Sequence, residues 1–360
     1  MSISALRISN DNLHRSSLYA DVSVRVDEKV LKNAGDLPDL VGSIDQGTSS
    51  TRFLVFTKQG RIAASAQMEH TQIFPSGEDK VGWHEHDPEE IYANTIRCIR
   101  VVYSQLQTAG VNLITTPLKA VGITNQRETT IAWNSETGDP YYNAIVWDDL
   151  RTTSIAEKIA KGNPDRFRSK TGLPLASYFS GTKVKWLLDN VPKLQEDLRN
   201  HPDVIRFGTM DTWLAYNLTG KERDDAVSNV GGTFITDVTN ASRWLFMDLK
   251  TLQWDKELID EICAPHNVPL TALPEIKSSS EVYATLSDSG GVPCLATVPL
   301  ASILGDQQSA LFGQSAYEPG EGKCTYGTGL FLMMNTGSRA VYSTHGLLTT
   351  VGYQLGEGGE

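Results

Sequence analysis

The chain has 360 residues, of which 32 are Lys or Arg and 43 are Asp or Glu, so its formal net charge is −11. An acidic protein of this kind lacks the basic surface that general nucleic-acid binding requires, and it is unsuited to an anionic membrane surface. With 40% hydrophobic residues and 7 Trp, 12 Tyr and 10 Phe, the composition is that of an ordinary globular protein with a sizeable core, which excludes a disordered chain.

The N-terminal segment carries no recognisable targeting signal. It has no continuous apolar stretch, and Asp11, Asp21, Asp27 and Glu28 interrupt the basic residues that a mitochondrial transit peptide would need. We therefore expect residues 1–38 to be a poorly ordered extension. No run approaches the roughly 18 apolar residues of a membrane span. The four cysteines are scattered without a CxxC pair, which favours the reducing cytoplasm and leaves association with mitochondria open.

Three strands are predicted directly after this extension, at residues 40–45, 52–56 and 61–68. Each is an apolar run bounded by turn residues, and a polar turn, Gln46-Gly-Thr-Ser-Ser-Thr51, joins the first two. The three segments therefore predict a meander with a glycine- and hydroxyl-rich hairpin at its head.

The next segment has the features of a helix that starts at Pro88. Asp87 can accept hydrogen bonds from the first turn, proline fits the first helical position, and Glu89 and Glu90 face the positive end of the helix dipole. Gly110 fits the C-terminal cap. Apolar residues recur at helical spacing and predict one buried face: Ile91, Ile96, Ile99, Val102, Tyr103 and Leu106.

Further elements are predicted along the rest of the chain. Strands that continue the sheet are expected at 119–124, 130–133 and 144–147, and helices at 211–218 and 254–263. A final β-rich region begins near Leu300 and contains a second strand–turn–strand unit around Tyr326-Gly-Thr-Gly329. Its likeness to the first unit suggests two related lobes, each with a hairpin whose N–H and hydroxyl groups can hold phosphate. Such turns also occur in β-rich proteins that bind no phosphate.

Three groups of polar residues are candidates for chemistry. Asp45 and Asp306 lie at predicted strand ends beside glycine-rich turns, where carboxylates suit Mg²⁺ held near phosphate. Arg127 and Glu128 follow a buried strand in a tight turn and can together grip vicinal hydroxyls, the alternative being a surface ion pair. The segment His84-Glu-His86 lacks the further ligands of a zinc site, so a solvated loop is expected there.

Seven motifs then point to a family. They are Asp45-Gln-Gly-Thr-Ser-Ser-Thr-Arg52, Asn125-Gln-Arg-Glu-Thr129, Tyr178-Phe-Ser-Gly-Thr-Lys183, Thr236-Asp-Val-Thr-Asn-Ala-Ser-Arg243, Gly305-Asp-Gln-Gln308, Thr325-Tyr-Gly-Thr-Gly329 and His345-Gly-Leu-Leu-Thr-Thr350. In this order they resemble the glycerol kinases of the FGGY carbohydrate kinase family, from about residue 40 to about residue 356. The resemblance implies an α/β chain with the ribonuclease H-like fold of the actin and hexokinase ATPases. It further implies a complete first lobe at 39–300 and a partial second lobe at 301–360.

The family's activity implies roles for residues of this chain. Members transfer the γ-phosphoryl group of ATP, with Mg²⁺, to glycerol and release sn-glycerol 3-phosphate and ADP. By its motif, Asp306 is the expected general base, and it is also an expected magnesium ligand together with Asp45. Glycerol is expected to contact Arg127, Glu128, Trp147, Tyr178, Asp306, Gln307 and Phe331. The ATP phosphates are expected to contact Thr48, Ser49, Ser50, Arg52, Gly327 and Thr328.

The end of the chain raises an alternative. In the family the second lobe continues well beyond the last motif and carries the adenine-binding glycines, whereas this chain ends at Glu360. We therefore expect a weakly active or inactive form, because the apolar residues 330–334 would lose their cover. The alternative is a non-catalytic glycerol-binding or regulatory isoform that pairs with a full-length subunit, since family members commonly form homo-oligomers. Another sugar or polyol kinase of the family is disfavoured by Asn125-Gln-Arg-Glu128 together with Tyr178.

Overall fold

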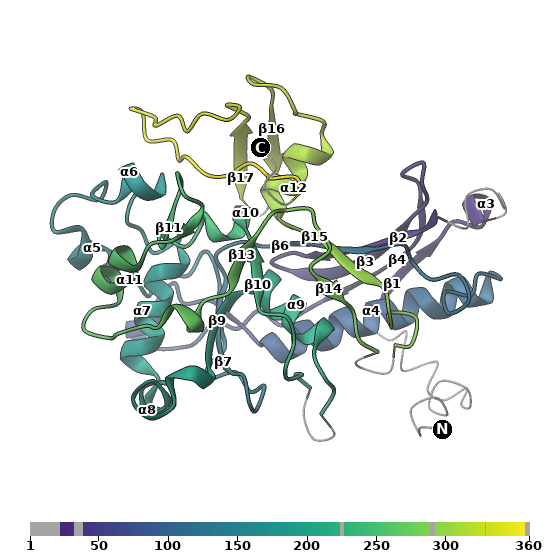
Figure 1. The fold of residues 1–360 in the computed structure, drawn as a ribbon, viewed down its shortest axis with the longest axis horizontal. Helices are drawn as coiled ribbons and strands as arrows, with labels where there is room; N and C mark the ends of the chain where they lie inside the picture. Colours follow the sequence, from purple (N-terminus) through teal and green to yellow (C-terminus); the bar gives the residue numbers. More distant parts are fainter. Residues whose placement is uncertain (1–21, 32–38, 224–226, 289–291, 328, 357–360) are drawn as a thin grey trace.

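The computed structural model describes residues 22–31, 39–223, 227–288, 292–327 and 329–356. Within them, a seven-stranded sheet is the largest sheet (Figure 1). Its order is β1 (Ser23–Val26), β4 (Ile62–Glu69), β3 (Ser50–Phe56), β2 (Val41–Gln46), β6 (Val121–Asn125), β15 (Pro299–Gly305) and β14 (Ala284–Thr285). Strand β6 runs parallel to both of its neighbours, β2 and β15, and the other pairs are antiparallel.

The predicted meander is present as β2, β3 and β4, within two residues of the expected bounds. The three parallel strands beside it end together at one edge of the sheet, where the register pairs Asn125 with both Gln46 and Gly305. Open α/β sheets bind their ligands outside the carboxyl ends of such strands. This edge therefore positions the candidate site.

Helix α4 (Pro88–Thr108) crosses one face of the sheet and packs on β3 and β4 (Figure 1). The cap formed by Asp87 is confirmed, since its Oδ1 accepts from the backbone N–H of Glu89 at 2.9 Å and of Glu90 at 3.3 Å. All residues of the predicted apolar face are buried. Gly110 follows the helix with φ of +89°, a conformation that glycine adopts without strain.

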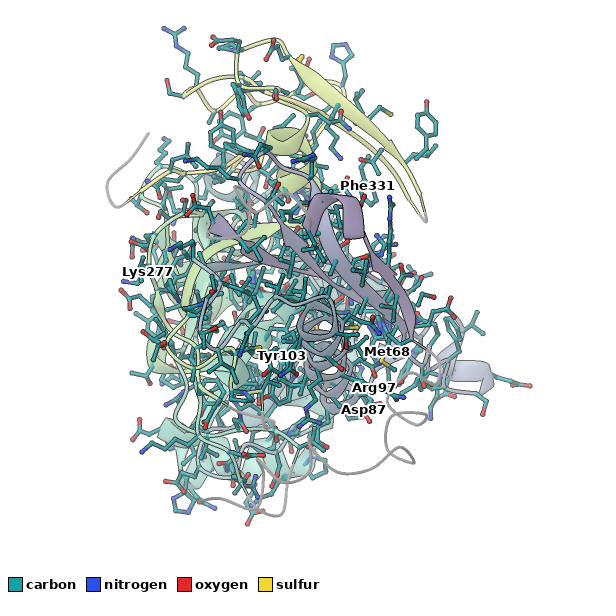
Figure 2. The ribbon with its side chains drawn as sticks, turned by 90° about the vertical axis from the view of Figure 1, so that its right-hand side faces the viewer. Met68, Asp87, Arg97, Tyr103, Lys277 and Phe331 are labelled. Carbon is teal, nitrogen blue, oxygen red and sulfur yellow. The ribbon has the colours of Figure 1, made fainter. Side chains whose placement is uncertain are left out.

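Two hydrophobic clusters form the core of the described residues. The first lies between the seven-stranded sheet and helices α4 and α9 (Met210–Thr219). Figure 2 labels Tyr103 on α4 and Met68 on β4, and both side chains are buried. The second cluster lies around α7 (Ser180–Asn190) and α11 (Lys256–Cys263), which pack on each other. Among all the residues that the structure describes, no helix is long and apolar enough to cross a membrane.

The smaller elements complete the fold. A second, four-stranded sheet has the antiparallel order β5 (Glu85–His86), β8 (Ala144–Ile145), β7 (Thr130–Asn134) and β9 (Ile205–Thr209). The two-stranded pairs are β10 (Ile235–Asp237) with β13 (Glu275–Lys277), β11 (Met247–Asp248) with β12 (Gln253–Trp254), and β16 (Gly322–Tyr326) with β17 (Leu330–Met334). The other helices are α3 (Glu28–Leu31), α5 (Thr153–Ala160), α6 (Arg168–Thr171), α8 (Pro192–Asn200), α10 (Val238–Ala241) and α12 (Asp306–Gly313), with short 3₁₀ turns η2 (Glu78–Lys80), η3 (Pro202–Val204) and η4 (Leu270–Ala272).

Several sequence expectations are corrected. Segments 130–133 and 144–147 do not continue the main sheet, because the turn after β6 redirects the chain into the second sheet. The region after residue 300 is β-rich as expected, with β15, β16 and β17, but β15 joins the main sheet and α12 follows it directly. The helices at 211–218 and 254–263 are confirmed as α9 and α11, although Trp254 belongs to β12.

The expected N-terminal extension is wrong in part. β1 pairs with β4 through four residue pairs, and α3 follows it. The edge of β4 offers unpaired main-chain groups, and β1 satisfies them. Residues 1–21 and 32–38 of the expected extension lie outside the described residues.

Candidate active site

A cavity of about 160 Å³ lies at the edge where β6 and β15 end. Its lining residues come from segments far apart in the sequence: Thr48, Gln126, Arg127, Glu128, Trp147, Tyr178, Asp306, Gln307, Thr325, Gly327, Gly329 and Phe331. All seven residues expected to contact glycerol are among them. The fold thus brings this predicted set together around one space.

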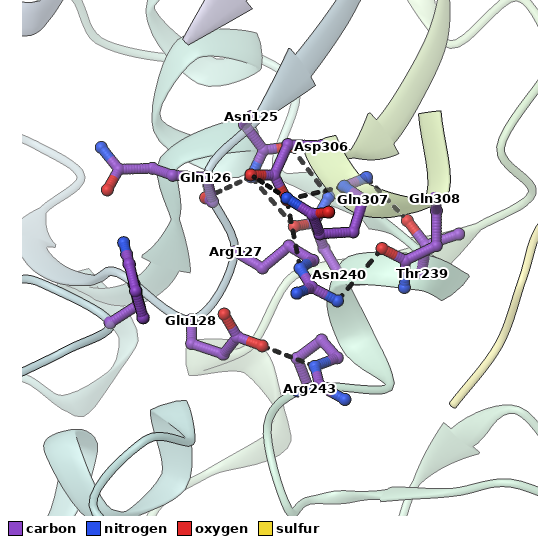
Figure 3. A network of polar contacts seen from close by, with 12 residues as sticks. Asn125, Gln126, Arg127, Glu128, Thr239, Asn240, Arg243, Asp306, Gln307 and Gln308 are labelled. Carbon is purple, nitrogen blue, oxygen red and sulfur yellow. Dashed lines mark hydrogen bonds and ion pairs between the residues drawn. The ribbon is translucent and has the colours of Figure 1, made fainter. Parts of the chain in front are cut away.

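Arg127 links several of these residues (Figure 3). Its Nε lies 3.2 Å from Oδ1 of Asp306, Nη1 donates to Oε1 of Gln308 at 3.3 Å, and Nη2 donates to the hydroxyl of Tyr178 at 3.5 Å. Burial opposes its charge, but Glu128, Tyr178 and Asp306 raise the pKa of Arg127 overall. Within the described residues the Nε–H has an ion-pair neighbour but no partner in hydrogen-bonding geometry.

Glu128 is held in a strained and buried turn. Its φ is +61°, a left-handed conformation that costs a non-glycine residue on the order of 1–3 kcal/mol. Its Oε1 accepts from Nε of Arg243 at 2.5 Å, and its backbone carbonyl accepts from Oγ of Ser180 at 3.2 Å. The alternative of a surface pair between Arg127 and Glu128 is therefore wrong, because both are buried and the partner of Glu128 is Arg243.

Asp306 begins α12 directly after β15. Its carboxylate accepts from the backbone N–H of Gln307 at 2.7 Å and from Nε2 of the same residue at 3.2 Å. Burial raises the pKa of Asp306, with Arg127 opposing the shift, while 35% of the side chain stays exposed. A Cβ on the preceding Gly305 would lie 2.6 Å from Cδ of Arg127, so glycine permits this close approach. The result is an accessible carboxylate beside a fixed guanidinium.

Aromatic rings make up another part of the cavity lining. Trp147 packs edge-to-face on Tyr178 and on Phe331, with ring centres 5.7 and 5.9 Å apart. Its Nε1 donates to Oγ1 of Thr48 at 2.9 Å, which ties the ring to the turn after β2. Figure 2 shows Phe331 on the β16–β17 hairpin, toward the central sheet. Burial raises the pKa of Tyr178 to about 12, so its phenol is neutral at neutral pH.

The residues expected to hold ATP phosphates divide into two groups. Thr48 and Gly327, from the turns of the β2–β3 and β16–β17 hairpins, line the cavity. The side chains of Ser49, Ser50 and Arg52 do not line it, and Arg52 instead pairs with Asp45 at 3.3 Å. Thr328 lies outside the described residues.

Asp45 and Asp306 were expected to contribute to a magnesium site. They lie at the ends of β2 and β15, with β6 between these strands, so their backbones are about 10 Å apart at the usual strand spacing. Burial raises the pKa of Asp45, with Arg52 opposing the shift. A Mg²⁺ ion held by both carboxylates at this separation would therefore be bound largely through water. Among the described residues, no group of three or more His, Cys, Asp or Glu could hold a metal ion.

The segment His84-Glu-His86 is not the expected solvated loop. It is buried because Glu85 and His86 form β5 and pair with β8. Glu85 accepts from Nη2 of Arg151 at 2.7 Å, and both histidines contact Oε1 of Gln72. These contacts satisfy the segment inside the protein.

Six residues near the cavity were not expected. Gln126, Thr325 and Gly329 line it. Arg243, Gln308 and Lys323 do not line it but form hydrogen bonds with residues that do. Lys323 is almost fully buried and donates to Oε1 of Gln307 and to Oγ1 of Thr325. Five of the six lie within the quoted motifs, and Lys323 stands two residues before one. The motifs could therefore have pointed to these six residues, but which residues they contact depends on the fold.

The fold and the cavity define the class of the protein. It has the actin- and hexokinase-like ATPase fold of the sugar kinases: the structure of a xylulose kinase from Rhodospirillum rubrum matches it with a TM-score of 0.66 at 17% identity, over 80% of this chain and 53% of that one. Residues 40–313 match the model of the N-terminal domain of the FGGY family of carbohydrate kinases. The chain belongs to this family.

Similar proteins carry a more specific name. A glycerol kinase of Pseudarthrobacter chlorophenolicus is 53% identical over 316 residues, which are 88% of this chain and 58% of that protein. A glycerol kinase of Brucella anthropi is 50% identical over 320 residues, 89% of this chain and 59% of that protein. The crystal structure of Plasmodium falciparum glycerol kinase with ADP matches with a TM-score of 0.76 and 38% identity, over 88% and 58% of the two chains. The chain thus spans somewhat more than half the length of these relatives.

Proposed function

We propose that the cavity binds glycerol and that the protein phosphorylates it with ATP, giving sn-glycerol 3-phosphate and ADP. The observation that carries this proposal is the mixed lining of the cavity, which combines the charged groups of Arg127, Glu128 and Asp306 with the rings of Trp147 and Phe331. A small polyol has the same two characters, because its hydroxyls need hydrogen-bond partners and its C–H groups favour an aromatic surface. The relatives named glycerol kinase support this substrate.

In the proposed reaction Asp306 acts as the general base. Its carboxylate accepts the proton of the terminal hydroxyl as that oxygen bonds to the γ-phosphorus, while the bond from phosphorus to the β–γ bridging oxygen breaks and ADP leaves. The burial that raises the pKa of Asp306 makes it a better proton acceptor. Because the transition state of phosphoryl transfer is loose, the orientation of the hydroxyls by Arg127 and Glu128 contributes in addition to the base.

The nucleotide is proposed to bind between the two glycine-rich turns that reach the cavity. The proposed phosphate contacts are Thr48, Ser49, Ser50, Arg52 and Gly327, together with Thr328. Asp45 and Asp306 would hold Mg²⁺ through water, and the ion would neutralise phosphate charge. The position of Asp45 near the end of β2, beside the first glycine-rich turn, supports this role.

Two measurements test the function. In calorimetry, the chain should bind glycerol, and Arg127→Ala should weaken binding at least ten-fold because it removes a buried donor to the ligand. In an assay of ADP release, Asp306→Asn should lower turnover about 10²–10⁴-fold with little change in glycerol affinity. Glu136→Gln, at an exposed position, is the control. Absence of glycerol binding, or near-normal turnover of Asp306→Asn, would contradict the proposal.

A non-catalytic glycerol-binding or regulatory isoform is the second candidate. It would bind glycerol with the same dependence on Arg127 but release no ADP, so the same pair of measurements separates the two. The relatives, which are named as kinases, favour the enzyme. The four cysteines are free thiols, which supports a cytoplasmic location. Homo-oligomer formation and the lobe boundaries at 39–300 and 301–360 remain predictions.

A further inference from the structure

Arg127 and Asp306, two residues of the proposed glycerol site, follow neighbouring strands of the main sheet. Arg127 follows the end of β6 and Asp306 follows the end of β15, and the register pairs Asn125 with Gly305 at these ends. The separation of the guanidinium and the carboxylate therefore depends on what holds the two strand ends beyond their last ladder bonds.

A single buried segment, residues 237–243, contacts both ends (Figure 3). The side-chain amides of Asn125 and Asn240 bond reciprocally, at 2.9 and 3.0 Å. The backbone N–H of Gly305 donates to Oγ1 of Thr239 at 2.9 Å. One short segment is thus hydrogen-bonded to the end of β6 and to the end of β15.

Asp237 orients the side chains of Thr239 and Asn240. Its Oδ1 accepts from Oγ1 of Thr239 at 2.9 Å and from the N–H and Nδ2 of Asn240 at 3.0 and 2.9 Å. Its Oδ2 accepts from the N–H of Thr239 at 3.1 Å and from Oγ of Ser279 at 2.8 Å. Five donors converge on one fully buried carboxylate.

This arrangement determines the direction of each hydrogen bond. A threonine hydroxyl has one proton, so donating it to Asp237 leaves the oxygen of Thr239 to accept from Gly305. The amide of Asn240 has two N–H groups, and one goes to Asp237 while the other goes to Asn125. The carboxylate of Asp237 does not line the cavity. It nevertheless determines which groups donate and which accept in the hydrogen bonds that join Thr239 and Asn240 to the two strand ends.

We propose that Asp237 is a positioning residue of the glycerol site, which through Thr239 and Asn240 fixes Asp306 relative to Arg127. The proposal rests on the function proposed above. It predicts that losing the carboxylate loosens the two strand ends together and weakens glycerol binding, although no atom of Asp237 reaches the ligand.

The test compares Asp237→Asn with Asp211→Asn in the full chain. Asp211 is also a fully buried carboxylate, and its oxygens accept from the hydroxyls of Thr209 and Thr236, each at 2.6 Å. In Asp237→Asn, an NH₂ group would face the N–H of Thr239 and could not accept its hydrogen bond. Hydrogen exchange should become faster in peptides 124–129 and 303–308 of this variant and stay unchanged there in Asp211→Asn. The glycerol Kd should rise about ten-fold or more in Asp237→Asn and less than two-fold in Asp211→Asn.

A second variant keeps the test decisive if Asp237→Asn does not fold. Thr239→Val preserves shape but removes the acceptor of the Gly305 N–H, so it should raise exchange in 303–308 and the glycerol Kd. This effect on Kd should shrink in an Asp306→Ala background, because the link would act on a side chain no longer present. Unchanged exchange in both peptides, or equal effects of the two aspartate variants, would overturn the proposal. If the wild-type chain binds no glycerol, the proposed function fails, while the exchange data still decide whether Asp237 holds the two strand ends.

Discussion

The two hairpins that reach the cavity share a local pattern and differ in their surroundings. Both consist of a strand, a turn rich in Gly and Thr, and an antiparallel strand, and both place a turn residue at the cavity. The β2–β3 hairpin is flanked by β4 and β6, and its inner residues Ile44, Phe53 and Val55 are buried. The β16–β17 hairpin is a sheet of two strands, and three side chains of β17 are largely exposed: Leu330 at 70%, Leu332 at 76% and Met334 at 62%.

This difference shows that a hairpin is determined locally but its stability is not. The turn chemistry and strand pairing follow from nearby residues, whereas the free energy of burial depends on neighbours far along the chain. The expectation that residues 330–334 lack cover is confirmed for Leu330, Leu332 and Met334, while Phe331 turns toward Trp147 and Arg127.

The largest expected effect comes from truncating one apolar side chain in each hairpin. Phe53→Ala removes a ring that is 1% exposed and should lower the free energy of unfolding by about 3–5 kcal/mol. Leu332→Ala removes a side chain that is 76% exposed and should change it by less than about 0.5 kcal/mol. Urea denaturation of both variants measures the difference. Similar losses would show that the β16–β17 hairpin is covered in solution.

A second prediction concerns acid sensitivity beneath the turn of the β2–β3 hairpin. Burial lowers the pKa of His70, whose Nε2 contacts the carbonyl of Thr48, and lowers the pKa of His86 to about 2. Above pH ~6.5 both states hold these rings neutral. As the pH falls below that value, the unfolded chain binds protons that the folded chain does not, so stability should drop by up to about 1.4 kcal/mol per pH unit for each histidine.

Denaturation midpoints at pH 7.5, 6.5 and 5.5 measure this slope. His86→Gln should reduce it, whereas His345→Gln, which alters an exposed ring near the C-terminus, should leave it unchanged. An equal slope in the wild type and in His86→Gln would remove His86 from the explanation.

A third, smaller effect is expected at the contact between the first turn and the cavity. Thr48→Val removes the acceptor for Nε1 of Trp147, a hydrogen bond worth about 0.5–1.5 kcal/mol. Glycerol affinity should fall about two- to ten-fold, and the fluorescence of Trp147 should change. Thr48→Ser keeps the hydroxyl and should behave as the wild type, so a loss of affinity in that variant would assign the effect to the methyl group.

The smallest effect on stability is expected from a charge on the exposed face of β17. Leu332→Lys should change the free energy of unfolding by less than about 0.5 kcal/mol. It should nevertheless reduce self-association in light scattering, because it interrupts an exposed apolar patch. Val81→Lys, at another exposed apolar residue outside the hairpin, is the control and should have no such effect.

Local signals in the sequence determined much of this protein. The cap of Asp87, the apolar face of α4 and the turn after β2 depend on residues within a few positions of one another, and the structure contains all three. The family resemblance likewise indicated seven residues that line one cavity, five of them within the motifs. The pairing of strands could not be predicted in the same way, because nothing near residues 130–133 shows that this segment pairs with β9 rather than with the main sheet.

Only the tertiary structure decided how the site residues are paired. Arg127 and Glu128 are adjacent in the chain, yet Arg127 lies against Asp306 while Glu128 pairs with Arg243. The parallel register of β6 and β15 brings Asn125 beside Gly305, and the buried segment at 237–243 links both. The reason is physical: residue types and turn geometry are local properties, whereas burial, ion pairing and the perturbed pKa of Asp306 arise from segments that meet only in the folded chain.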